Sequence, residues 1–169
     1  LLNSTSATDV DVSFSVHTNK NAVGGNDYIY GVVRRNGNNE YRVKLRFATN
    51  GNVFVSASTT LNNVETPIGT EVRVTNLTHA ANAIIHFRAQ VTGTSPTTLR
   101  VRAWADGTTE PTTWQYAATD SAAALQVAGS LGLRAYMSSG VTNAPVVFSF
   151  DDYRVTSIGT NRAPVFSTD

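Results

Sequence analysis

Apolar and polar residues alternate along most of this chain with the two-residue period of β-strands. In residues 10–17, valine and phenylalanine take every second position, and polar side chains fill the positions between them. Because successive side chains of a strand point to opposite faces, such a segment buries one face and exposes the other. Comparable segments follow at residues 28–35, 41–48, 53–58, 71–74, 85–91, 99–104, 114–118, 131–137 and 146–155. These roughly ten short strands predict an all-β, two-sheet antiparallel β-sandwich, with a closed barrel as the less favoured alternative.

Tight turns separate several of these strands. Asn36 and Gly37 lie between the second and third segments, and Asn50 and Gly51 follow the third. Asn and Gly tolerate the positive φ angles of tight hairpin turns. Residues 28–58 are therefore predicted to form three consecutive antiparallel strands.

Two stretches of the chain are less regular. Pro67 and Gly69 mark a turn before the short strand predicted at residues 71–74. The alanine-rich residues 121–127 are predicted to form a turn or a single helical turn, since no long segment has the 3.6-residue period of a helix.

The strand at residues 99–104 has an unusual polar face. Its leucine, valine and alanine share the apolar face, so Trp104 lies on the other face together with Arg100 and Arg102. A tryptophan beside guanidinium groups suits stacking on a flat, hydroxylated ligand such as a sugar ring. The alternative is that Trp104 closes the end of the sheet, where the strand gives way to Asp106 and Gly107.

Cationic side chains gather on the polar faces of two strands. One strand carries Arg42, Lys44 and Arg46, and the other carries Arg100 and Arg102. If both faces line one surface, that surface should prefer uronate-bearing or otherwise anionic polysaccharides, because arginine matches carboxylates. The alternative is a solvated outer face on which the cations pair with Glu40, Glu71 or Asp120.

Composition narrows the classes of function. Only 15% of the residues are charged and the net charge is +1, which indicates no nucleic-acid partner. The chain has no cysteine, so disulfides and thiolate metal sites are excluded. No apolar run approaches the roughly 18 residues that a membrane span requires.

The length of 169 residues suits one domain, which we place at residues 1–158. Residues 159–169 contain turn formers after the last strand and are predicted to be a linker towards a following domain, with a frayed terminus as the alternative. Leu1 and Leu2 are too short to be a signal peptide. We therefore expect a monomeric module excised from a larger extracellular or cell-surface protein, with neighbouring domains of the same chain as partners.

Signatures of catalysis are missing from the sequence. Retaining glycosidases need two carboxylates about 5 Å apart, and no Glu-x-Asp-x-x-Glu strand supplies them. No Gly-x-Ser-x-Gly elbow is present, and three histidines without cysteine make a transition-metal site unusual. We predict that the chain is not an enzyme.

Three pieces of the chain resemble a known type of module. The first is the tyrosine-rich strand at 28–34 with the hairpin into 41–46, and the second runs from Trp104 through Glu110 to Trp114. The third joins residues 132–136 to residues 150–154. Over residues 9–158 the chain resembles the concanavalin A-like, laminin-G-like jelly-roll modules of bacterial extracellular proteins.

This resemblance implies a curved jelly roll that binds carbohydrate. We therefore expect a non-catalytic carbohydrate-binding module in which aromatic stacking and hydrogen bonds from arginine and asparagine hold a polysaccharide. The candidate binding residues are Trp104, Arg102, Arg100, Tyr30 and Arg34. The first alternative is a structural or adhesive spacer with no aromatic-floored groove, and the second is a glycoside hydrolase-like enzyme with a facing pair of carboxylates. Fold analogy does not decide among them.

The resemblance also implies one structural calcium ion. Calcium takes six to eight oxygen ligands, and Asp151 and Asp152 stand together in the last strand, where alternation turns one of them towards the apolar face. In similar jelly rolls an ion bridges the first and last strands, which adds Asp9 and Asp11 as candidate ligands. The alternative is that the Asp151 and Asp152 carboxylates pair with arginines or backbone amides.

Overall fold

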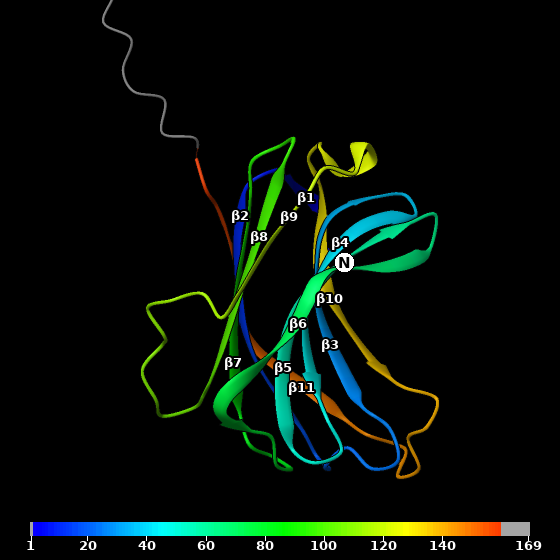
Figure 1. The fold of residues 1–169 in the computed structure, drawn as a ribbon, viewed down its shortest axis with the longest axis vertical. Helices are drawn as coiled ribbons and strands as arrows, with labels where there is room; N and C mark the ends of the chain where they lie inside the picture. The colour runs from blue at the N-terminus through cyan, green and yellow to red at the C-terminus, as the bar shows by residue number, and fades with distance from the viewer. Residues whose placement is uncertain (1, 160–169) are drawn as a thin grey trace, which may run out of the picture.

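Two antiparallel sheets pack face to face in the computed structural model, which describes residues 2–159 and the side chains of residues 5–159 (Figure 1). The large sheet has the strand order β1 (Leu2–Ala7), β10 (Gly129–Met137), β3 (Asp27–Asn36), β4 (Asn39–Phe47), β5 (Asn52–Leu61) and β6 (Val64–Thr78). The small sheet has the order β11 (Phe148–Ser157), β2 (Val10–Thr18), β7 (Ile85–Thr92), β8 (Thr97–Ala105) and β9 (Tyr116–Asp120). The predicted two-sheet antiparallel sandwich is confirmed.

The core lies between the two sheets and follows the alternation of the sequence. In β4, every second side chain from Tyr41 to Phe47 is fully buried, and the cationic side chains between them point away from the small sheet. In β7, Ile85 and Phe87 point into the core while His86 and Arg88 point outward. Each sheet therefore has one apolar inner face and one polar outer face.

Strand boundaries differ from the predictions mainly in β6, which covers 15 residues rather than residues 71–74. The first strand, β1, was not predicted. Register shifts in the pairing of β6 with β5 accommodate Pro67 and Gly69 within the strand. An edge strand tolerates proline because its outer backbone positions need no partner. The predicted run of three strands is confirmed as β3, β4 and β5.

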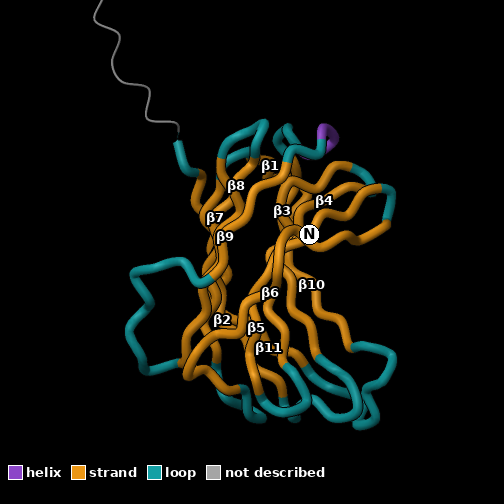
Figure 2. Tube along the Cα trace, in the orientation of Figure 1, coloured by secondary structure: helices purple, strands orange, loops and turns teal. Residues whose placement is uncertain are grey.

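The alanine-rich segment forms a single 3₁₀ turn, η1 (Ala123–Leu125), visible as the only helical piece of the described chain (Figure 2). Residues 2–159 thus hold no helix that could cross a membrane. The predicted linker, apart from Gly159, lies outside the described residues.

Arg34 is a buried side chain at one end of the sandwich. Its backbone has a φ angle of +48°, and the register of β3 against β4 shifts beyond Val33. This irregularity turns the guanidinium inward, although strict alternation would place it outside with Tyr30. The guanidinium donates hydrogen bonds of 2.6–3.3 Å to the carbonyls of Thr8, Gly93 and Leu125, the Thr97 hydroxyl and the Asp9 carboxylate.

These contacts tie β3 to the turn between β1 and β2, the turn between β7 and β8, and η1. Burial lowers the pKa of Arg34, and the adjacent Asp9 carboxylate opposes that shift. The carbonyls that Arg34 satisfies would lose their donor if the guanidinium were removed. Arg34 therefore closes this end of the sandwich, and its predicted role in glycan binding is wrong because the side chain is fully buried.

We expect Arg34→Met to lower the free energy of unfolding by about 3–5 kcal/mol, the cost of breaking a buried ion pair from one side. Methionine keeps much of the volume, so the loss reports the hydrogen bonds rather than a cavity. Urea unfolding measures the change. The matched control is Arg73→Met on an exposed position of β6, which should change stability by no more than about 0.5 kcal/mol. Equal midpoints for the two variants would contradict this role of Arg34.

Candidate binding groove on the small sheet

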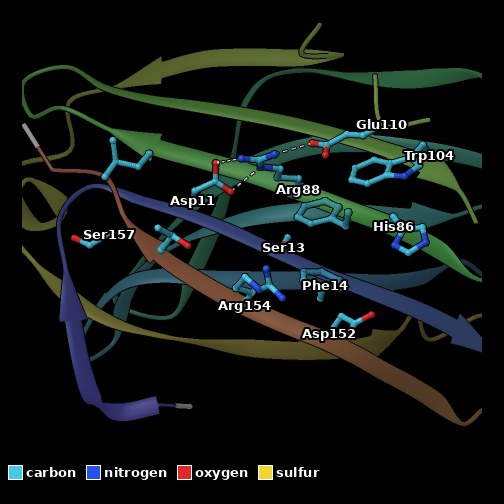
Figure 3. Close-up of a pocket in the computed structure, with 13 residues that line it drawn as sticks. Asp11, Ser13, Phe14, His86, Arg88, Trp104, Glu110, Asp152, Arg154 and Ser157 are labelled. Atoms are coloured by element: carbon cyan, nitrogen blue, oxygen red, sulfur yellow. Dashed lines mark hydrogen bonds and ion pairs between the residues drawn. The ribbon is translucent and has the colours of Figure 1, made fainter. Parts of the chain in front are cut away.

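A groove of about 570 Å³ lies on the outer face of the small sheet (Figure 3). Its floor comes from β2, β7 and β8, and β11 forms one side. The loop after β8 brings Glu110 over the sheet from the other side. The groove is therefore assembled from both ends of the chain and its middle.

Trp104 and His86 form the aromatic end of the groove. The two residues are direct partners across β8 and β7, and their rings stack with centroids 5.4 Å apart and planes 17° from parallel. His86 Nε2 lies 2.8 Å from an oxygen of Asp106, and this hydrogen bond lowers the pKa of Asp106. Trp104 remains half-buried and lines the groove on the outer face of the sheet.

Arg88 organises the polar floor of the groove. Its guanidinium makes two hydrogen bonds of 2.8 and 2.9 Å to the Asp11 carboxylate, and a third of 3.0 Å to Glu110. The hydrogen bonds with Asp11 raise the pKa of Arg88, and those with Glu110 add to the shift. Gln90 also donates to Asp11, at 2.7 Å. Arg88 thus holds two carboxylates with a single positive charge, and Arg102 supplies a second cation to Glu110.

Arg102 holds the loop that carries Glu110. It forms an ion pair with Glu110, donates to the carbonyl oxygen of Pro111 at 2.7 Å, and places its guanidinium 4.3 Å from the ring centroid of Trp114. Arg102 is therefore next to the groove but directed at the loop. Arg100 is exposed farther along the same strand and does not line the groove.

Asp152 and Arg154 form the open side of the groove. Asp152 has a φ angle of +54° at a shift in the pairing of β11 with β2. This bulge keeps both Asp151 and Asp152 exposed, so the expectation that one of them faces the apolar side is wrong. Within residues 5–159, neither Asp152 nor Arg154 has an ion-pair partner. Their side chains are available to a ligand.

Tyr30 lies on the outer face of the large sheet, opposite the groove. Only 5% of it is exposed, because the cationic groups of Arg42 and Lys44 lie 5.4 and 5.6 Å from its ring centroid. Among the five predicted glycan-binding residues, the structure thus brings only Trp104, Arg102 and Arg100 to one face, and only Trp104 into the groove.

The two cationic strand faces do not line one surface, and the alternative of cations paired with Glu40 and Glu71 holds for Arg42 and Arg46. The cationic side chains of β4 point outward from the large sheet and those of β8 point outward from the small sheet, so they lie on opposite sides of the molecule. Most of them are also neutralised. Arg42 and Lys44 share Glu65, and Arg46 pairs with Glu71.

The carboxylates proposed for calcium do not converge on one point. Asp9 accepts hydrogen bonds from Arg34 and from the backbone of Gly93, and Asp11 is held by Arg88 and Gln90. No group of three or more His, Asp or Glu side chains suited to a metal occurs within the described residues. The first and last long strands, β2 and β11, are neighbours, but the residues present do not fit a bridging ion held by all four aspartates.

The groove also lacks the arrangement expected of a retaining glycosidase. Its two inner carboxylates, Asp11 and Glu110, both accept hydrogen bonds from Arg88. Retaining glycosidases direct both carboxylates at the scissile bond, whereas these two are turned towards one guanidinium.

Most of the groove was missed by the sequence analysis. His86, Arg88, Glu110 and Arg154 were not among the candidate binding residues, and Asp11 and Asp152 were assigned to calcium. The available signal was the alternation in β7, where His86 and Arg88 occupy outer positions. Their pairing with Trp104 and Arg102 depends on the register of β7 against β8, which alternation alone does not specify.

Comparisons with known proteins support the fold. No protein-family model and no curated protein matches the chain. The carbohydrate-binding module CBM66 from Bacillus subtilis aligns with a TM-score of 0.58 and 15% identity, over 91% of this chain and 78% of that one. A xylan beta-1,4-xylosidase from Bacillus halodurans C-125 aligns with a TM-score of 0.52 and 8% identity, over 89% of this chain. A GH43 protein from Bacillus licheniformis aligns with a TM-score of 0.55 and 11% identity, over 89% of this chain.

This chain spans 28% of the length of each of the last two proteins. At such low identities the likeness shows a shared β-sandwich fold alone. Membership in the concanavalin A-like, laminin-G-like type stays a prediction.

Calcium at Asp151 and Asp152 stays a prediction with a direct test. An ion that binds only the folded state raises its stability by mass action. If the site exists, the melting temperature should be higher in millimolar calcium than in chelator. The double variant Asp151→Asn, Asp152→Asn should remove that difference. Identical melting temperatures of the wild-type protein in the two conditions would exclude a structural ion.

Proposed function

We propose that this chain is a non-catalytic carbohydrate-binding module of a secreted or cell-surface multidomain protein, and that glycan binds in the groove of the small sheet. The observation that carries the proposal is the half-exposed Trp104, stacked on His86 at the end of a groove of about 570 Å³. A groove of this size takes one or a few sugar units. The fold shared with a carbohydrate-binding module supports the same assignment.

The chemistry of the groove matches a sugar. The face of an aromatic ring stacks on the apolar C–H face of a pyranose or furanose ring, and planar charged groups exchange hydrogen bonds with its hydroxyls. Arg88, Asp11 and Glu110 are held rigidly by one another, so they lose little conformational entropy when a ligand binds. Arg88 and Arg102 together balance the charges of Asp11 and Glu110, so the groove favours a neutral glycan.

The alternatives fit the groove less well. A spacer domain has no use for an aromatic side chain at the end of an open groove, and the stacked Trp104 favours the binding module over it. A hydrolase is disfavoured because Arg88 engages both inner carboxylates.

The decisive variant is Trp104→Ala. We expect it to weaken binding of neutral oligosaccharides by about tenfold or more, the size of effect that a buried aromatic anchor has in an interface. Calorimetric titration with the tightest ligand from a glycan array measures the change. The matched control is Phe54→Ala, which removes a half-buried aromatic that stacks under Arg46 on the outer face of the large sheet. Its affinity should equal that of the wild type.

Two results would contradict the proposal. One is unchanged affinity of Trp104→Ala, and the other is no binding of any glycan by the wild-type chain, which would favour the spacer. If Trp104→Ala unfolds, the wild-type protein still provides a test. The indole signals of Trp104 and Trp114 can be followed by NMR during titration, and only that of Trp104 should shift at low ligand concentration.

A further inference from the structure

The outer face of the large sheet has a small polar hollow of about 100 Å³, on the opposite side of the sandwich from the groove. It lies beside the turn between β3 and β4, where four strands and two turns meet. Its charged lining residues are Arg35, Arg42, Arg134 and Glu40. Three cations against one anion make this hollow electropositive in a chain whose net charge is only +1.

The ion pairs within the hollow do not neutralise all of its arginines. Glu40 is almost fully buried, and its two oxygens accept hydrogen bonds from Arg42 Nε at 2.5 Å and from Arg35 Nη1 at 3.4 Å. Arg42 also binds Glu65 through Nη1 at 2.5 Å. Arg134 has no ion-pair or hydrogen-bond partner among the described residues and is exposed at the mouth. The acceptors in the hollow are thus occupied by Arg42 and Arg35, and Arg134 remains available.

Thr60 is the second observation that points to a ligand. The residue is only 2% exposed and lines the hollow. Its Oγ1 is buried and has no hydrogen-bond partner within the described chain. A buried hydroxyl without a hydrogen-bond partner destabilises the folded state. An oxygen atom seated in the hollow would accept a hydrogen bond from Thr60 and remove this cost.

Tyrosines that do not themselves line the hollow lie next to Arg134 on the same outer face, along β10 and β3. Arg134 is the direct cross-strand partner of Tyr30, and Tyr136 is the partner of Tyr28. The rings of Tyr28 and Tyr136 have centroids 6.0 Å apart, and Tyr136 is 46% exposed. An electropositive hollow beside an exposed aromatic surface matches a sugar ring that carries an anionic substituent.

We propose that this hollow binds the oxyanion substituent, carboxylate or sulfate ester, of an acidic glycan, with Arg134 and Thr60 as its donors and Tyr136 beside the sugar ring. The site is distinct from the groove on the small sheet. This proposal depends on the proposed function in one respect, namely that the anion belongs to a glycan. The hollow itself should bind a free oxyanion whether or not the groove binds sugar.

The first test uses inorganic sulfate as the probe. Titration of the wild-type protein, followed by NMR at constant ionic strength, should shift the backbone amide signals around Arg35, Thr60 and Arg134 with one saturating curve. Thr60→Val keeps the shape and removes the hydroxyl. We expect it to weaken sulfate binding about tenfold while the melting temperature stays the same or rises, because an unpartnered hydroxyl is lost. Unchanged sulfate affinity in Thr60→Val would show that water satisfies the hydroxyl and would overturn the proposal.

Arg134→Gln tests the charge. It should weaken sulfate binding by about tenfold, whereas the control Arg73→Gln, an exposed arginine on the same face but outside the hollow, should have little effect. Equal losses in both variants would mean diffuse attraction to a basic surface and would contradict a defined site.

The second test identifies the carrier. An oligogalacturonide, a sulfated oligosaccharide and a neutral oligosaccharide are titrated in parallel. Arg134→Gln should weaken binding of an acidic ligand and leave the neutral one unchanged, and Trp104→Ala should do the reverse. The acidic ligand whose affinity falls more in Arg134→Gln identifies the preferred substituent as a carboxylate or a sulfate ester. If neither acidic ligand responds to Arg134→Gln, the proposal fails, whatever the result for Trp104.

Discussion

The two sheets meet through their apolar faces, and this packing decides where every other group of the molecule lies. Strand side chains alternate between faces, so filling one face with the core leaves polar and charged groups only on the outer faces. The groove residues on β7 and β8 are the outward neighbours of core residues such as Phe87 and Ala103. A substitution in the core would therefore move the groove as well, because both are carried on the same strands.

Pairing shifts register at several places, and two of these bulges change which side chains reach the outer surface. At Arg34 the break turns a guanidinium into the interior, where it joins turns from both sheets. At Asp152 the break turns a carboxylate out to the side of the groove. A bulge adds one residue to one strand of a pair. Side chains at or beyond it can therefore point to the opposite face from the one that the two-residue period predicts. These two residues show that small backbone irregularities placed groups where alternation alone would not.

The sequence was sufficient for the sandwich, for most strands and for the outward direction of Trp104, because all three follow from the period of apolar residues. It was insufficient for Arg34, whose place depends on a positive φ angle, and for β6, whose pairing with β5 extends through Pro67 and Gly69. The polar network of the groove could not be predicted from the sequence either. Arg88, Asp11 and Glu110 are far apart in the chain and meet only through strand register and a loop. Composition counts such charges but does not show that they neutralise one another.

The groove and the small hollow face away from each other across the thickness of the sandwich. One polysaccharide chain cannot fill both sites without passing around an edge of a sheet. Two polysaccharide chains can occupy them at once, one bound mainly by aromatic stacking and the other by arginine. Simultaneous occupation would make the domain a cross-bridge within a polymer network. Its avidity would then depend on the spacing of polymer strands in that network rather than on the length of any linker in the protein.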